Sequence, residues 1–156
     1  MDLNANVFSQ FDKGWALLTA GSKDDFNTMT ISWGGMGTLW SRPVVTVYVK
    51  PIRHTYEFME KSDYFTVSFF PEEYKEALGI LGTKSGRDCN KVELSGLTPV
   101  EVQHSMSFRE ASRTLVCRKL YHQDLDASQV PEDAQERYYK NEPIHRMYIG
   151  EVVEIL

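Results

Sequence analysis

Runs of β-branched and aromatic residues recur along this chain and constrain its fold more than any other feature. Successive side chains of a strand point to opposite faces, so alternating runs of this kind favour β-strands. Six segments have this character: residues 15–21, 27–33, 44–50, 64–70, 113–122 and 146–156. They do not alternate regularly with helices, which argues against a parallel α/β sheet. The sequence therefore predicts a mainly β fold, an antiparallel barrel with a few added helices.

Three short helices are expected between these strands. Residues 71–82 carry apolar residues at the i, i+3, i+4, i+7 spacing of an amphipathic helix, with acidic residues in the first turn. Two further helices are expected over residues 54–61 and 132–139. Residues 34–37, with the sequence GGMG, are interpreted as part of a glycine-rich turn. No repeat or linker divides the chain, so one domain over residues 1–156 is expected.

Composition excludes several classes of partner. The net charge of −5 argues against general binding of nucleic acid or of anionic membranes, because both require clustered positive charge. No apolar run approaches the roughly 18 residues of a membrane span, and no signal peptide is visible. Cys89 and Cys117 lack CxxC or metal-ligand spacing, which indicates no disulfide and a reducing cytoplasm. The histidines show no paired ligand spacing, so no metal site is expected.

The segment KPIRHT, residues 50–55, has the features of a phosphate site. A strand ends at Lys50, Pro51 forces an extended exit, and a helix begins near His54 or Thr55. Arg53 and Thr55 then flank the free amides of a helix N-terminus, which together suit a phosphomonoester. In the alternative interpretation, Thr55 only caps the helix and Arg53 is a solvated surface residue.

The segment GTKSGRDCNK, residues 82–91, is the second candidate. It offers backbone amides and the cations Lys84 and Arg87 in a flexible polar loop, as in a lid over an anionic ligand. It is not a Walker loop, because the GxxxxGK[ST] order is absent. A solvated, charged turn is the alternative.

The segment NTMTISW, residues 27–33, alternates hydroxyl side chains with large apolar ones. The hydroxyl row comprises Thr28, Thr30 and Ser32, and the apolar row comprises Met29, Ile31 and Trp33. The glycines that follow would let the backbone approach a flat ligand closely, since glycine has no Cβ. Core packing is the alternative role of the apolar row.

Catalytic motifs are scarce elsewhere. There is no GxSxG nucleophile elbow. His145, just before the last expected strand, is a candidate for donating or accepting a proton near neutral pH; the alternative is a loop histidine without a role. Cys89 lies beside basic residues that lower a thiol pKa, although a lone loop cysteine is more often incidental.

In combination, these motifs resemble the flavin reductase-like family of FMN-binding split barrels. The resemblance rests on the ordered series N-x-M-T-x-S-W, R-x-T after a proline-terminated strand, F-T-V-S, and G-x-K-S-G-R-D. It runs from Trp15 to Lys91, with a weaker echo in HRMYIGEVVE. It implies a six-stranded antiparallel split barrel and a homodimer with one FMN per subunit near the dimer interface.

The resemblance also implies site residues. Arg53 and Thr55 would take the FMN phosphate, the loop around Ser85 would close over it, and His145, the one catalytic candidate, would shape the nicotinamide pocket. The implied cofactor-binding set is Asn27, Met29, Thr30, Ile31, Ser32, Trp33, Lys50, Arg53, His54, Thr55, Lys84, Ser85, Gly86 and Lys91.

The implied activity is hydride transfer from NADH or NADPH to FMN, with the flavin supplying the redox chemistry. Two alternatives stay open: a flavoredoxin-like electron carrier that a partner protein reduces, and a non-redox FMN-binding dimer. No sequence feature selects NADH over NADPH. Oxidation of NADH in the presence of added FMN distinguishes the reductase from both alternatives.

Overall fold

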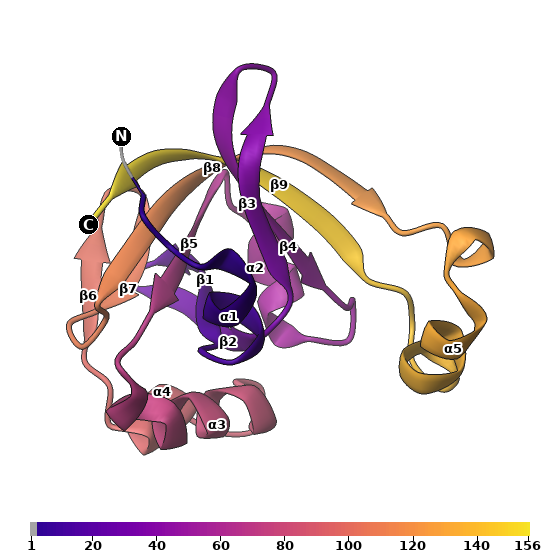
Figure 1. Cartoon of the computed structure of the whole chain (residues 1–156). Helices are drawn as coiled ribbons and strands as arrows, with labels where there is room; N and C mark the ends of the chain where they lie inside the picture. Colours follow the sequence, from indigo (N-terminus) through magenta and orange to yellow (C-terminus); the bar gives the residue numbers. More distant parts are fainter. Residues whose placement is uncertain (1–2) are drawn as a thin grey trace.

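A seven-stranded antiparallel sheet is the framework of the computed structural model, which describes residues 3–156 (Figure 1). Met1 and Asp2 of the expected single domain lie outside the described residues. The strands are β1 Ala16–Ser22, β2 Asp25–Ile31, β3 Gly34–Leu39, β4 Arg42–Val49, β5 Tyr64–Phe69, β8 Arg113–Asp124 and β9 Arg146–Ile155. Their order is β2-β1-β5-β8-β9-β4-β3, so the two edge strands follow each other in sequence. The mainly β antiparallel fold is confirmed, with one strand more than the six expected.

The additional strand is β3, and the interpretation of GGMG as a turn is wrong. Gly34 pairs with Val47 and the ladder continues along the β3–β4 hairpin, whose cross-strand hydrogen bonds override the poor strand preference of glycine. A Cβ on Gly34 would lie 2.6 Å from the ring of Phe11, so glycine permits this close packing. The reversal falls instead at Trp40 and Ser41, whose positive φ values of 52° and 58° are typical of a tight hairpin turn.

The helices partly follow the expectations. They comprise α1 Val7–Asp12, α2 His54–Lys61, a 3₁₀ turn at Glu72–Tyr74, α3 Lys75–Thr83, α4 Lys91–Ser95, a 3₁₀ turn at Ala127–Gln129, α5 Glu132–Ala134 and a π-helical turn at Gln135–Tyr139. The helix over residues 54–61 is confirmed. The helix expected over residues 71–82 begins later, at Lys75, and continues through Gly82 to Thr83. The short helices α1 and α4 and the hairpin of β6 Pro99–Val102 with β7 Ser105–Phe108 were not expected, because segments this short show no clear period.

Strand β1 separates two hydrophobic cores. Leu18 is fully buried inside the barrel, where it packs in a cluster with Val47 and Phe65. Its neighbour Leu17 faces the other way and packs in a second cluster with Leu78 of α3. Helices α3 and α4 lie together below the barrel in Figure 1. This arrangement fixes the loop between α3 and α4 beside strand β2.

The sequence predicts no membrane-spanning helix, no metal-ligand cluster and no disulfide. No helix within residues 3–156 is long and apolar enough to cross a membrane. The same part of the chain contains no group of three or more His, Cys, Asp or Glu side chains that would hold a metal ion. Cys89 and Cys117 are free thiols.

Candidate functional site

Two adjoining cavities lie where strand β2 leads into strand β3. The first, of about 120 Å³, is here called the helix-end cavity because it lies at the start of α2. The second, of about 290 Å³, is called the aromatic cavity because Trp33 and Tyr138 line it. Met29, Thr30 and Arg53 line both.

The structure brings all the sequence-predicted site residues to these two cavities. The helix-end cavity is lined by Asn27, Met29, Thr30, Arg53, His54, Thr55, Lys84, Ser85, Gly86 and Lys91. The aromatic cavity is lined by Met29, Thr30, Ile31, Ser32, Trp33, Lys50, Arg53 and His145. Residues from four separate parts of the sequence thus lie along one continuous surface.

The helix-end cavity is built around the first turn of α2. Arg53 occupies the N-cap position with extended backbone, and the helix begins at His54. Thr55 is therefore the second helical residue, so its expected alternative role as the helix cap is wrong. The amides of His54 and Thr55 have no intrahelical acceptor. The Arg53 guanidinium is exposed and makes no hydrogen bond or ion pair within residues 3–156.

Asn27 joins the strand to the helix in this cavity. Its Nδ2 donates to Oγ1 of the buried Thr55 at 2.8 Å, so the hydroxyl proton of Thr55 is left to donate elsewhere. A Cβ on Gly86 would lie 2.3 Å from Oδ1 of Asn27. The loop after α3 therefore reaches β2 only because position 86 is glycine.

Lys91 supplies a second positive charge. Only 5% of the residue is exposed, and its Nζ donates to the carbonyls of Leu81 at 3.1 Å and Lys84 at 3.3 Å. Burial lowers the pKa of Lys91 to about 8, and the nearby Arg53 guanidinium acts in the same direction. Lys91 forms no ion pair with a carboxylate of the described residues. The cavity thus combines two cations and free helix amides, the donor set that binds phosphate in proteins.

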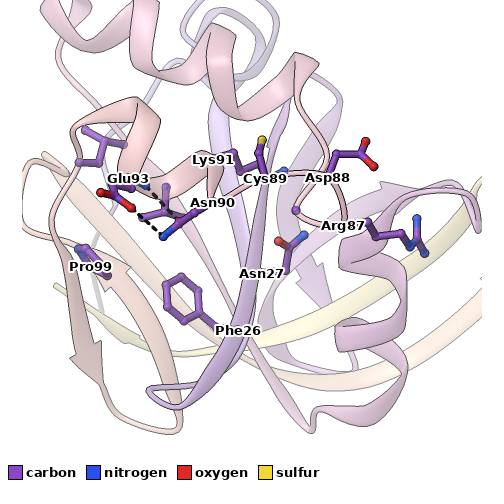
Figure 2. A pocket seen from close by; sticks show the side chains of 12 residues that line it. Phe26, Asn27, Arg87, Asp88, Cys89, Asn90, Lys91, Glu93 and Pro99 are labelled. Carbon is purple, nitrogen blue, oxygen red and sulfur yellow. Dashed lines mark hydrogen bonds between the residues drawn. The ribbon is translucent and has the colours of Figure 1, made fainter.

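The outer side of the same loop forms an open groove of about 790 Å³ (Figure 2). Asn27 and Lys91 border both the groove and the helix-end cavity. Figure 2 shows Arg87 pointing away from Lys91, toward α2. There Arg87 donates to the carbonyl of Ile52 at 3.0 Å and to Oε1 of Glu57 at 2.5 Å. Arg87 therefore fastens the loop to α2, and its charge is already paired, contrary to its expected role as a free cation of the loop.

The aromatic cavity includes residues that sequence reasoning missed. The ring of Trp33 lies 4.8 Å from that of Tyr138 and 5.4 Å from that of His145, measured between centroids. Tyr48 and Glu142 complete the lining. The helix expected over residues 132–139 is divided into α5 and the π-helical turn. Neither that turn nor the irregular segment after it carries a motif, so nothing in the sequence signalled that Tyr138 and Glu142 reach β2.

Lys50 connects this irregular segment to the barrel. It is only 7% exposed, and its Nζ donates to the carbonyl of Tyr138 at 2.8 Å and to Oε2 of Glu142 at 2.5 Å. The Lys50 ammonium lowers the pKa of the Glu142 carboxyl through this hydrogen bond. The positive charge of Lys50 is therefore neutralised within the protein.

His145 is held in a neutral state. Tyr139 Oη lies 2.6 Å from its Nδ1. Burial lowers the pKa of His145 to about 4, with the positive charges of Lys50 and Arg53 acting in the same direction. The expectation that His145 exchanges a proton near neutral pH is therefore wrong; at pH 7 it is a neutral hydrogen-bonding group.

Two hydroxyls of the row, those of Thr28 and Thr30, bond to the protein itself, whereas Ser32 follows β2 and lines the aromatic cavity. Thr28 Oγ1 lies 2.8 Å from Thr19 Oγ1 and donates to the carbonyl of Leu18 at 3.2 Å. Thr30 Oγ1 donates to the carbonyl of Leu78 in α3 at 2.5 Å. Although Thr30 lines both cavities, its hydroxyl proton is used to hold α3 against β2.

Several solved structures share this fold at low sequence identity. Flavoredoxin from Methanosarcina acetivorans is 20% identical with a TM-score of 0.74, covering 100% of this chain and 74% of that chain. An FMN-binding domain of a flavin reductases-like enzyme from Shewanella baltica is 20% identical with a TM-score of 0.69, covering 96% and 71%. Nitrilotriacetate monooxygenase component B from Bacillus cereus is 21% identical with a TM-score of 0.70, covering 90% and 67%. These likenesses establish the split-barrel fold.

Family membership rests on the sequence match. No curated protein matches this chain at a significant level. The model of the flavin reductase like domain, in contrast, matches residues 8–156, nearly the whole chain. With its antiparallel split barrel and the two cavities at β2, the chain belongs to the flavin reductase-like family.

Proposed function

We propose that this protein binds FMN across the two cavities and reduces it with NADH or NADPH. The observation that carries the proposal is a pair of cations at the N-terminus of α2, Arg53 and Lys91, for which residues 3–156 provide no carboxylate partner. Two clustered positive charges beside free helix amides are costly unless an anion joins them. The flavin phosphate is such an anion, and the names of similar structures include FMN-binding proteins.

Each part of the site has a role in this proposal. Arg53, the hydroxyl of Thr55 and the remaining N–H of Lys91 hold the phosphate, with the loop at Ser85 and Gly86 alongside. The flat ring lies in the aromatic cavity, where Trp33 and Tyr138 limit the access of water. Bound FMN supplies the redox chemistry, because no side chain of the protein carries a hydride.

The proposal is tested by titrating the purified protein with FMN and then adding NADH or NADPH without oxygen. We expect saturable binding and loss of the oxidised flavin absorbance on adding a nicotinamide nucleotide. If the flavin binds but only dithionite reduces it, the result would favour the non-redox FMN-binding protein over the reductase. Reduction by a partner protein alone would instead favour the flavoredoxin-like electron carrier. Failure to bind FMN would overturn the whole proposal.

We also propose that the protein is a homodimer. An open groove of about 1110 Å³ runs between α1 and β3, and most of the residues lining it are apolar. Phe8 is 89% exposed there and Trp33 40% exposed, a surface that a second copy would cover favourably. Sedimentation is expected to give a dimer that Phe8→Glu weakens and that Leu156→Glu, an exposed site outside the groove, leaves intact. A monomeric wild-type protein would contradict the proposed dimer.

The cytoplasmic location stays a prediction.

A further inference from the structure

A short hydrogen bond joins the phenol of Tyr139 to the imidazole of His145. Tyr139 Oη lies 2.6 Å from Nδ1 of His145 and has no other hydrogen-bond partner within residues 3–156. Burial raises the pKa of Tyr139, so its phenol keeps its proton at neutral pH. A phenol with one partner donates its only proton to that partner when the partner offers a lone pair. A neutral imidazole whose Nδ1 accepts from Tyr139 carries its ring proton on Nε2.

We propose that Tyr139 is a positioning residue that fixes His145 as the Nε2–H tautomer, so that the ring presents an N–H donor to a carbonyl oxygen of the ligand in the aromatic cavity. The hydrogen bond from His145 to a ligand rests on the proposed function, whereas the tautomer of His145 does not depend on it. Two carbonyl sources fit this chemistry, the flavin ring and the carboxamide of nicotinamide.

The surroundings of His145 support a fixed neutral donor. Lys50, directly after β4, and Arg53, before α2, oppose a second proton on the ring. The Glu142 carboxylate, which favours one, is already bonded to Lys50. The uncharged rings of Trp33 and Tyr48 pack on its other sides, at centroid distances of 5.4 and 6.5 Å. Nε2 makes no hydrogen bond within the described residues and is not fully buried, and His145 lines the aromatic cavity.

The position of Tyr139 is itself secured. Tyr139 is the last residue of the π-helical turn Gln135–Tyr139, and Lys50 binds the carbonyl of the preceding residue, Tyr138, at 2.8 Å. The phenol is therefore held by a buried anchor one residue away. This is the arrangement required of a group that orients another one.

The tautomer is measured first in FMN-free protein, by long-range ¹H–¹⁵N correlation of the imidazole nitrogens at neutral pH. We expect His145 to be neutral with its proton on Nε2. In Tyr139→Phe we expect both tautomers and a titration midpoint that rises toward the ordinary value of about 6.5, because the neutral ring has lost its donor. Tyr138→Phe is the matched control and is expected to leave the tautomer unchanged. A proton on Nδ1 in the wild type, or no change in Tyr139→Phe, would overturn the proposal.

The ligand is then identified by adding FMN alone, or FMN followed by oxidised NAD. A shift of the Nε2–H resonance with FMN alone assigns the acceptor to the flavin ring, and a shift that requires NAD assigns it to the carboxamide. If neither ligand shifts the resonance although both bind, the donor role is overturned. Because the tautomer is measured without ligand, loss of the proposed function would leave the first result standing.

Turnover provides a separate readout. Tyr139→Phe is expected to lower kcat about tenfold, the scale of one lost hydrogen bond, with little change in the Kd of FMN. His145→Gln keeps an N–H donor that has no tautomer, so adding Tyr139→Phe to it is expected to have no further effect on kcat. Fully additive losses in the double variant would show that Tyr139 acts independently of His145 and would overturn the positioning role.

Discussion

Lys50 and Lys91 are both nearly buried, yet the two ends of the site treat them differently. Lys50, at the aromatic cavity, meets the carboxylate of Glu142 at 2.5 Å. Among the described residues, Lys91 at the helix-end cavity meets only backbone carbonyls and the neighbouring charge of Arg53, and its pKa falls to about 8. Each cavity contains a nearly buried lysine, so the number of cations does not distinguish them. The partners do: the charge of Lys50 is balanced at the aromatic cavity, whereas the charge of Lys91 at the helix-end cavity is left to attract an anion.

The largest expected effect on FMN binding is at the helix-end cavity, where the positive charges are not balanced. Arg53→Ala is expected to weaken FMN binding by about 1.5–3 kcal/mol, roughly 10- to 150-fold in Kd, because a charge-assisted hydrogen bond is lost. Fluorescence titration of FMN measures it. The control is Arg109→Ala, an exposed arginine outside both cavities. Equal Kd values for wild type and Arg53→Ala would remove Arg53 from the phosphate site.

Gly86→Ala tests whether the loop must approach β2 closely. The new Cβ would lie 2.3 Å from Oδ1 of Asn27, so the loop must move, and we expect a loss of about 1–3 kcal/mol in the free energy of unfolding and weaker FMN binding. The control is Gly79→Ala in α3, where no atom lies within 4 Å of the added Cβ. It is expected to raise stability by about 0.5–1 kcal/mol in urea denaturation. Similar urea denaturation curves for the Gly86→Ala and Gly79→Ala variants would contradict the close approach of the loop to β2.

The lowered pKa of Lys91 predicts a pH dependence of binding. The cationic form binds phosphate and predominates below the pKa of about 8. Above that pH, binding must first restore the proton, so the Kd of FMN rises by up to about tenfold per pH unit. Measurement between about pH 7 and 9.5 keeps the phosphate, with a second pKa near about 6, fully ionised.

Lys91→Arg is the matched variant for this pH dependence. An arginine keeps its charge throughout the range, so its binding curve is expected to be flat. A flat curve in the wild type as well would show that Lys91 does not contact the phosphate.

The smallest effect on FMN binding is expected at the aromatic cavity, where the charge of Lys50 is balanced. Glu142→Gln removes the carboxylate that neutralises Lys50; since Glu142 is about half exposed, the effect is modest. We expect FMN binding to tighten by less than about threefold at low salt. Hydrogen exchange over residues 138–145 is expected to become faster. Glu136→Gln, in an exposed pair with Lys140, is the control. Binding weakened tenfold by Glu142→Gln would contradict the comparison of the two ends.

Sequence analysis succeeded where a site depends on local geometry. The start of α2 was predicted from a proline-terminated strand followed by Arg53, His54 and Thr55, and the helix covers the expected residues. Its N-terminal amides follow from helix geometry alone. The strands were predicted because half-buried β-structure requires alternating side chains.

Prediction failed where a segment is defined by distant partners. The six-residue strand β3 contains three glycines, and only its pairing with β4 and its contact with Phe11 make it a strand. Nothing in the sequence indicated that the hydroxyls of Thr28 and Thr30 bond to β1 and α3. Both outcomes depend on which elements pack together.

The sequence by itself determined the antiparallel character of the fold, the helix that begins at His54 and the family to which the chain belongs. These follow from side-chain period and from motifs within short windows, which short-range sterics and hydrogen bonding control. Only the tertiary structure decided which charges are free. Lys50 is neutralised from 92 residues away by Glu142, Arg87 is bound to α2, and Arg53 has no partner in the described part of the chain. Electrostatic pairing depends on distances through space, and the order of residues along the chain does not set those distances.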